Sequence, residues 1–245
     1  MEPLSAIVIA AALVGPTVPT VEAAEAVVAE TDRASARDFD ERTRLSRTFP
    51  NELYRLYGSE SAASGQWGDA LRQFRHAARY ADKYSQHRIS LMYWHGVGVQ
   101  RDRALAYAWA DLAAERLYPT FAVLREKMWL DLDDAERERA LREGVALYAE
   151  FGDQVAKPRL AAAIARHRSQ ITGSHVGYHD GRLQVMAAGP AAASAFDMMG
   201  GYDLRPMYAA WRMDADRYWA VEDAIWKYGS VEVGPAVPAK RRKDD

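Results

Sequence analysis

The chain repeats its residue pattern at a separation of 36 positions, the distance from Ala77 to Ala113 and from Ala113 to Ala149. The same shift aligns four apolar positions of the first unit with apolar positions of the second: Leu53, Leu56, Tyr57 and Ala78 with Ile89, Met92, Tyr93 and Ala114. Periods of about 20 to 50 residues are typical of stacked units that cannot bury their apolar faces alone. We therefore predict an all-α protein, a short α-solenoid of helical hairpins, for which binding is a more natural role than catalysis.

The period divides residues 50–151 into three predicted helical hairpins. Their first helices are expected at about residues 51–58, 84–95 and 119–130, and their second helices at about 67–80, 102–116 and 134–150. In the central hairpin, Ala106, Trp109 and Ala113 recur at helical spacing and form one apolar face. The small residues let a partner helix approach closely, whereas Trp109 and Tyr93 fill the space beside them.

The connection inside the central hairpin carries backbone signals of its own. Gly96 stands where the first helix should end, at the position where a left-handed residue closes a helix and glycine does so at least cost. Gly98 permits a second unusual backbone angle in the connection. Asp102 is then placed to accept hydrogen bonds from the unpaired N–H groups that begin the next helix. These local signals predict the same helix boundaries as the period.

Nine residues of this unit resemble the Sel-one-like repeat, a helical hairpin of the tetratricopeptide type, in both order and spacing: Met92, Tyr93, Gly96, Gly98, Asp102, Ala106, Trp109, Ala113 and Ala114. The resemblance is specific over this unit and weaker in the two units beside it. Leu117 stands where the family usually ends the second helix with glycine. The resemblance implies an α-superhelical scaffold for protein–protein contacts, often in bacterial envelopes, and it confers no catalytic residues.

We expect four further segments around the repeats. Residues 1–26 have the pattern of a signal peptide, because an apolar run at Leu4–Val14 precedes a small-x-small motif at residues 24–26. That run is shorter than the roughly 20 apolar residues that span a bilayer, so no transmembrane span is predicted in the mature chain. After the signal peptide we expect a linker at 27–49 and a repeat domain with a capping helix at 50–169. An aromatic-rich segment that packs on the repeats should follow at 170–230, and a tail at 231–245.

The signal peptide predicts a periplasmic or secreted protein. Glu2 stands where export signals usually carry positive charge, so a cytoplasmic location is the alternative. Removing residues 1–26 takes three glutamates from the 34 acidic residues and leaves 31 against 32 basic ones. A net charge this small gives no long-range attraction for nucleic acid. Cysteine is absent, which excludes disulfides and thiolate metal sites.

The C-terminal segment is unusually aromatic between Tyr202 and Tyr228. Three tryptophans, Trp211, Trp219 and Trp226, recur at helical spacing and give one face of a predicted helix a strongly aromatic character. Such stripes are more often core than ligand platform, so we expect this helix to dock on the repeats. If the rings were exposed, they would suit the stacking of sugars or the capture of a peptide.

Two polar clusters have both a chemical and a structural interpretation. His175 and His179 lie four residues apart, as zinc ligands on a helix do, but Gly173, Gly177 and Gly181 make a helix there improbable. A metal-dependent hydrolase is therefore a distant alternative. The second cluster, Asp131, Asp133, Asp134 and Glu136, coincides with the predicted start of a helix, where negative charge favours the helix dipole.

The sequence as a whole predicts a non-catalytic scaffold that binds another protein or peptide and needs no cofactor. The candidate binding residues are Arg72 and Asp111, on the expected exposed faces of the second helices, together with Trp211, Trp219 and Trp226. The alternative is a carbohydrate- or cell-wall-binding module that uses the C-terminal aromatic side chains. Charge reversal at Arg72 or Asp111 is expected to weaken binding of a partner, whereas His175 and His179 are expected not to matter.

Overall fold

The computed structural model describes residues 39–171 and 205–228, and within these ranges the chain is mostly helical and contains no strand. The α-helices are α3 (Phe39–Ser46), α4 (Pro50–Ala63), α5 (Trp67–Ala78), α6 (Lys83–His95), α7 (Arg103–Ala113), α8 (Pro119–Asp131), α9 (Asp134–Phe151), α10 (Asp153–Ile171) and α12 (Ala215–Tyr228). Two short 3-10 helices, η1 (Ala114–Arg116) and η2 (Arg205–Tyr208), complete the described part. The predicted all-α class is confirmed for these residues.

Helices α4 to α9 correspond to the six helices expected between residues 50 and 151. The largest difference is the end of α4, which lies at Ala63 rather than near residue 58. The additional turn stays helical because it buries Ser59 and Ala62, and Ala62 belongs to the main core. Helix α4 packs against α5, and α6 packs against α7.

The predicted backbone signals of the central connection are confirmed. Gly96 closes α6 in the left-handed conformation with φ of 71°, and Gly98 has the same positive φ. The Asp102 carboxylate caps α7 by accepting from the Leu105 N–H at 3.0 Å. Leu117 ends η1 with φ of 54° and so adopts the conformation that glycine reaches without steric cost.

The main core lies between α4, α5, α6, α7 and the end of α9. Trp109 is 1% exposed there, and its ring centroid lies 4.9 Å from that of Phe151. Of the nine residues that resemble the repeat family, five are fully buried and therefore structural in this fold: Met92, Ala106, Trp109, Ala113 and Ala114. Tyr93 is half-buried against the same core.

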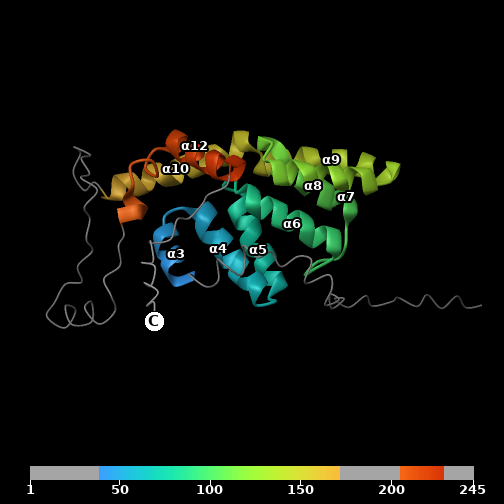
Figure 1. The fold of residues 1–245 in the computed structure, drawn as a ribbon, viewed down its shortest axis with the longest axis horizontal. Coiled ribbons are helices and arrows are strands. Elements are labelled where there is room, and N and C mark those ends of the chain that lie inside the picture. Colours follow the sequence, from blue (N-terminus) through green and yellow to red (C-terminus); the bar gives the residue numbers. More distant parts are fainter. Residues whose placement is uncertain (1–38, 172–204, 229–245) are drawn as a thin grey trace, which may run out of the picture.

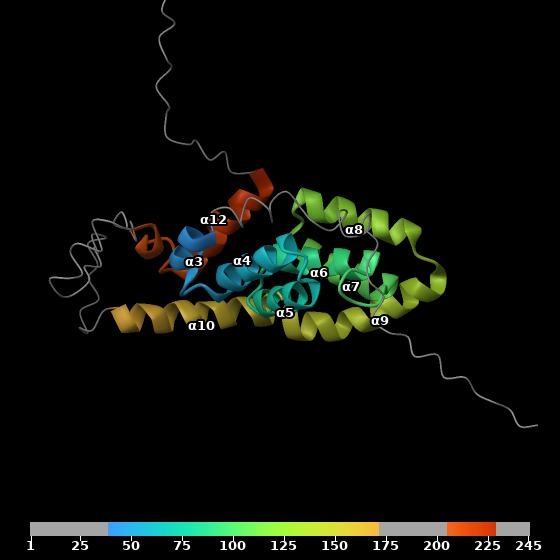
Figure 2. The same ribbon diagram turned by 90° about the horizontal axis from the view of Figure 1, so that it is seen from below.

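The third predicted hairpin packs differently from the first two. Helix α9 lies mainly along α7 rather than along α8, and α8 packs along α7 as well, with Trp129 against Tyr107 and Arg125 beside Asp111. Ala104 of α7 and Ala140 of α9 are both buried with Leu132 in a small core of their own. Figure 2 shows α8 and α9 diverging on either side of α7 after they leave their shared turn.

Helices α9 and α10 follow one another end to end along one side of the molecule (Figures 1 and 2). Helix α10 corresponds to the predicted capping helix; it begins at Asp153 and carries Pro158 inside it. A partner far from Asp153 in sequence fixes this start: the Glu115 carboxylate accepts from the Asp153 N–H at 3.1 Å. Leu160 of this helix is fully buried.

The predicted linker at 27–49 is wrong for residues 39–49, which contain α3 and the fully buried Phe49. The Phe49 ring stacks on Tyr218 of α12 with 5.6 Å between centroids. A second core therefore joins this segment to the C-terminal one, and its fully or largely buried members are Phe49, Ala81, Ala156, Leu160, Ile164, Tyr218 and Trp219. Sequence alone suggested a linker because the surrounding residues are charged.

A buried ionic cluster, which we call the junction, holds α6, η1 and α10 together. The Lys83 ammonium is 1% exposed and lies 2.6 Å from Glu115 and 3.1 Å from Asp153. The Arg116 guanidinium donates two hydrogen bonds to Asp153, at 2.7 and 2.9 Å. Burial alone would raise the pKa of the Asp153 carboxyl, but the Arg116 hydrogen bonds and the Lys83 charge outweigh it and hold the pKa well below its usual range.

None of the helices in the described ranges has both the length and the hydrophobicity that a bilayer-crossing segment needs. The predicted signal peptide at 1–26 and the tail at 231–245 lie outside the described residues, as do most of the segment at 170–204 and the two histidines at 175 and 179.

Candidate functional site

The C-terminal aromatic helix docks on the repeats, as the sequence predicts. Trp219 is 8% exposed in the second core, with the Arg116 guanidinium 4.5 Å and the Lys157 ammonium 5.3 Å from its ring centroid. Trp226 is half-buried and stacks on Tyr84 with 5.7 Å between centroids. Packing of this kind occupies the faces of both rings, so neither tryptophan forms an open platform for a sugar.

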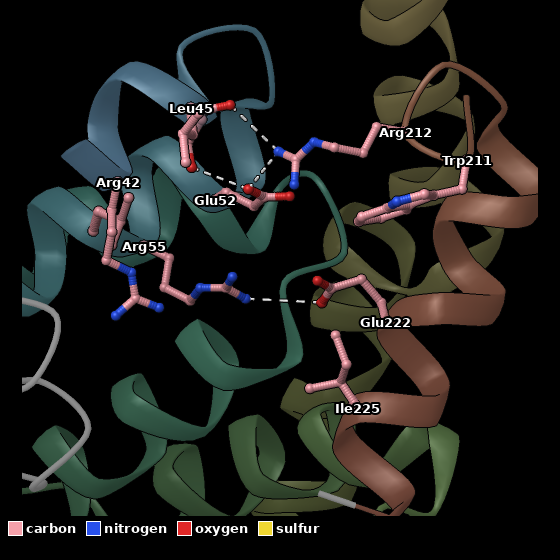
Figure 3. Close-up of a pocket in the computed structure, with 10 residues that line it drawn as sticks. Arg42, Leu45, Glu52, Arg55, Trp211, Arg212, Glu222 and Ile225 are labelled. Atoms are coloured by element: carbon pink, nitrogen blue, oxygen red, sulfur yellow. Dashed lines mark hydrogen bonds and ion pairs between the residues drawn. The ribbon is translucent and has the colours of Figure 1, made fainter. Parts of the chain in front are cut away.

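Trp211 lies elsewhere, in the wall of a charged cavity between the N-terminal helices and the C-terminal helix (Figure 3). The cavity has a volume of about 490 Å³. Its walls come from α3, α4, the turn before α12 and α12 itself: Arg42, Leu45, Ser46, Glu52, Arg55, Leu56, Trp211, Arg212, Glu222 and Ile225. The two sides are far apart in sequence, so spacing alone could not predict the cavity.

Glu52 is the most strongly anchored group of the cavity. It accepts hydrogen bonds from Ser46 Oγ at 3.0 Å, from Arg212 at 2.7 Å and from the Tyr218 hydroxyl at 2.8 Å. Burial would raise the pKa of the Glu52 carboxyl, but the charges of Arg212 and Arg55 outweigh it, so the pKa is lowered. Glu52 is therefore a fixed anion that holds α4 to the turn before α12.

Glu222 faces Glu52 across the cavity and is held less tightly (Figure 3). Its nearest cation is Arg55, at 3.9 Å, and Arg55 lies closer to Asp82, at 2.8 Å. Burial raises the pKa of the Glu222 carboxyl, and the neighbouring charge of Glu52 adds to the effect. A carboxyl group of this kind, beside guanidinium groups and a tryptophan ring, can exchange hydrogen bonds with a polar ligand.

An apolar groove of about 540 Å³ runs between α6 and α8. Its lining, which we call the α6–α8 groove, consists of His87, Leu91, Pro119, Thr120, Val123, Leu124 and Lys127. Burial, with the nearby Arg88 charge, lowers the pKa of His87 to about 3, so the imidazole is neutral at physiological pH. Its ring stacks on Phe121 with 4.7 Å between centroids.

Four exposed apolar side chains lie on the last two helices of the array, and one of them, Val123, also lines the α6–α8 groove. Val123 and Leu130 of α8 and Leu141 and Val145 of α9 each expose more than half of the side chain. Leu141 and Val145 lie one turn apart on α9 and therefore share a face. We call these four residues the α8–α9 apolar surface. The sequence pattern did not distinguish them from core positions.

The two charged residues proposed for binding have different surroundings. Arg72 is exposed on α5 and forms a surface ion pair with Asp69, as expected for a residue on an outer face. Asp111 is half-buried, which corrects the expectation that it is exposed. It accepts a hydrogen bond from the Tyr148 hydroxyl at 3.1 Å and lies 3.5 Å from Arg125, so it joins α7, α8 and α9.

The acidic cluster at the α8–α9 turn is a helix start, as the structural interpretation predicts. Asp133 accepts from the Glu136 N–H at 2.8 Å, and Glu136 accepts from the Asp133 N–H at 3.0 Å, which is a capping box. Among the residues that the structure describes, no group of three or more potential ligands could hold a metal ion.

No family model, no curated protein and no solved structure matches this chain. The resemblance of the central hairpin to the Sel-one-like repeat therefore rests on the nine residues that carry it.

Proposed function

We propose that this chain is a non-catalytic helical scaffold, a short solenoid with a period of 36 residues, that binds another protein or peptide through the α8–α9 apolar surface. The observation that carries the proposal is where the exposed apolar side chains lie. In the described ranges, four of the seven exposed large hydrophobic residues belong to α8 and α9. Scattered apolar residues are ordinary on a protein surface, whereas a cluster of them marks an interaction site.

The position of the surface supports the same proposal. Stacked helical units bury their apolar faces against the next unit, and the last unit needs a cover on its outer side. Helix α10 leaves the end of α9 and packs on α12, so it does not cover the outer side of α8. Arg142 and Glu138 pair with each other on α9 beside the apolar residues and form a polar rim like that of protein interfaces.

We also propose that the scaffold acts in a bacterial cell envelope after export, in the periplasm or outside the cell. The apolar run at Leu4–Val14, the small-x-small motif at 24–26 and the resemblance of the central hairpin support this location.

A pair of charge substitutions on α9 tests the binding surface. Leu141→Glu with Val145→Glu should weaken binding of the partner at least about tenfold, because two carboxylates would have to be desolvated in an apolar contact. The partner is first identified by chemical crosslinking of the tagged chain in its native cells, followed by mass spectrometry. Its affinity for purified variants is then measured by calorimetry.

Ala135→Glu with Ala146→Glu is the matched control, because both alanines are exposed and lie on a different side of the same helix from Leu141 and Val145. The control adds the same charge and should retain the wild-type affinity. Equal affinity of the two double variants would show that the partner binds elsewhere.

The carbohydrate-binding alternative keeps one supporting observation, the place of Trp211 in the charged cavity. A half-buried ring beside Glu52, Arg55 and Glu222 combines an apolar face with hydrogen-bonding groups, and a volume of about 490 Å³ suits a small ligand. Trp219 and Trp226 do not contribute to this alternative, because Trp219 is buried in the second core and Trp226 packs against the main core.

This second function is tested by titrating the protein with cell-wall oligosaccharides while its tryptophan fluorescence is monitored. If the cavity binds them, Trp211→Ala should abolish a saturable change, because stacking on the ring is lost. Tyr57→Ala, which removes an aromatic ring that is 38% exposed outside the cavity, should retain it. No saturable change with the wild-type chain would contradict the carbohydrate function and leave the protein scaffold unaffected.

A further inference from the structure

The α6–α8 groove lies next to the point where the described part of the chain ends. Helix α12 ends at Tyr228, and its Trp226 ring lies 5.4 Å from Phe121 and 6.3 Å from Tyr118, between centroids. These two residues flank Pro119 and Thr120 at the beginning of the groove, and Phe121 stacks on His87 inside it. Figure 2 shows the end of α12 beside the beginning of α8.

The chain that follows α12 has the length to run along the whole groove. Helix α8 contains 13 residues and is therefore about 20 Å long. An extended segment spans about 3.3 Å per residue, so residues 229–237 could cover about 30 Å. The stretch that leaves α12 can therefore pass Thr120, Val123 and Lys127 in that order.

The residues of this stretch are complementary in polarity and charge to the groove and to the α8–α9 turn at its far end. Residues 231–237 read VEVGPAV, an apolar run with one carboxylate, and the groove is apolar with one ammonium group, that of Lys127. Residues 240–243 read KRRK. In the same order along α8, the groove leads to three exposed acidic residues at the α8–α9 turn: Asp131, Asp133 and Asp134.

We propose that the α6–α8 groove is the docking site of the chain's own segment 231–237, with the basic residues 240–243 placed against the acidic α8–α9 turn. Apolar burial against Leu91, Val123 and Leu124 holds the segment, and the charge pairing sets its direction. This inference goes beyond the proposed scaffold function and does not depend on it, because Val123 is the one residue of the α8–α9 apolar surface that the docked segment would cover. Its consequence is that the groove is occupied from within the molecule, so another peptide would have to displace the segment.

The absence of cysteine from the sequence makes a direct test simple. In the full chain, Val123→Cys is combined with Val233→Cys, which places one thiol in the groove and one in the segment. The matched control combines Ala146→Cys on the exposed side of α9 with the same Val233→Cys. Both variants are oxidised mildly at low protein concentration, and disulfide formation is followed by mobility on non-reducing gels after their folding has been checked by circular dichroism.

A docked segment should crosslink to position 123 within the same molecule at least about tenfold faster than to position 146, because docking raises the local thiol concentration at one place only. Reversing the charges of residues 240–243 to glutamate should slow the reaction at position 123 and leave the control unchanged. Equal rates at the two positions would overturn the proposal. Crosslinks that join two molecules, and that become faster with concentration, would assign the groove to a second copy instead.

Discussion

Replacing Trp109 by alanine is expected to lower the free energy of unfolding by about 3 to 5 kcal/mol, the range found when a large aromatic side chain is removed from a core. Trp109 of α7 is 1% exposed, and its ring contacts Phe151 at the end of α9. Its removal therefore leaves a cavity between α7 and α9. Small neighbours such as Ala113 have no side-chain atoms that could move in to fill it.

This effect is measured by denaturant titration of the purified chain. A loss of stability appears as a lower denaturant concentration at the midpoint of unfolding, with an unchanged dependence of the free energy on denaturant concentration. Tyr57→Ala provides the comparison, because this ring is 38% exposed and its loss should cost less than about 1 kcal/mol. If Trp109→Ala also costs less than about 1 kcal/mol, the Trp109 ring does not fill the space between α7 and α9, and the packing of the central hairpin is different from that described.

The second large effect is expected at the junction. Asp153→Asn should destabilise the protein by about 3 kcal/mol, because removal of one charge from a buried ionic cluster leaves its partners uncompensated. The substitution keeps the size of the side chain but leaves Glu115, 2.6 Å from Lys83, and Asp223, 3.7 Å from Arg116, as the remaining carboxylates beside these two buried cations. Asp69→Asn, in a surface ion pair with Arg72, should change the stability by less than about 0.5 kcal/mol.

The stability that the Asp153 carboxylate contributes is also expected to depend on pH, and the direction of this dependence follows from its pKa. The pKa of Asp153 in the folded protein is depressed below its ordinary value of 3.8, so the folded state binds the proton less readily than the unfolded state does. The stabilisation from this carboxylate is therefore complete above about pH 5 and is lost as the pH falls through and below 3.8. The stability difference between wild type and Asp153→Asn should shrink in that range. A difference that stays constant down to pH 3 would show that the Asp153 charge contributes nothing at the junction.

Much of the helical part could be predicted from sequence because its signals are local. Gly96 and Asp102 act on residues within one turn, and the apolar spacing around Trp109 reports which face of α7 is buried. The same local rules placed Asp133 and Glu136 at the start of α9, where the structure shows that they form a capping box. Boundaries were less accurate where long-range packing extends a helix, as Ala62 does at the end of α4.

The charged cavity and the second core could not be predicted, because their parts come from opposite ends of the chain. Arg212 reaches Glu52 over a separation of 160 residues, and no spacing rule connects two such positions. The start of α10 has the same cause, since Asp153 is held by Glu115 and Arg116 rather than by its own neighbours. Asp111 was expected to be exposed because a helical wheel does not show that α8 and α9 both supply partners to it.

The pairing of the N-terminal helices with α12 has a consequence for the synthesis of the protein. Asn51 donates to the Tyr218 hydroxyl across 167 positions, and the Phe49 ring is covered by the same tyrosine. A ribosome that adds roughly 5 to 20 residues per second needs about 10 to 30 s to make the intervening chain. The hairpins between Phe49 and Tyr218 can fold early because their contacts are local in sequence, whereas Phe49 stays exposed until Tyr218 has been synthesised. Nascent chains that stall before residue 218 should therefore be the most aggregation-prone form of this protein.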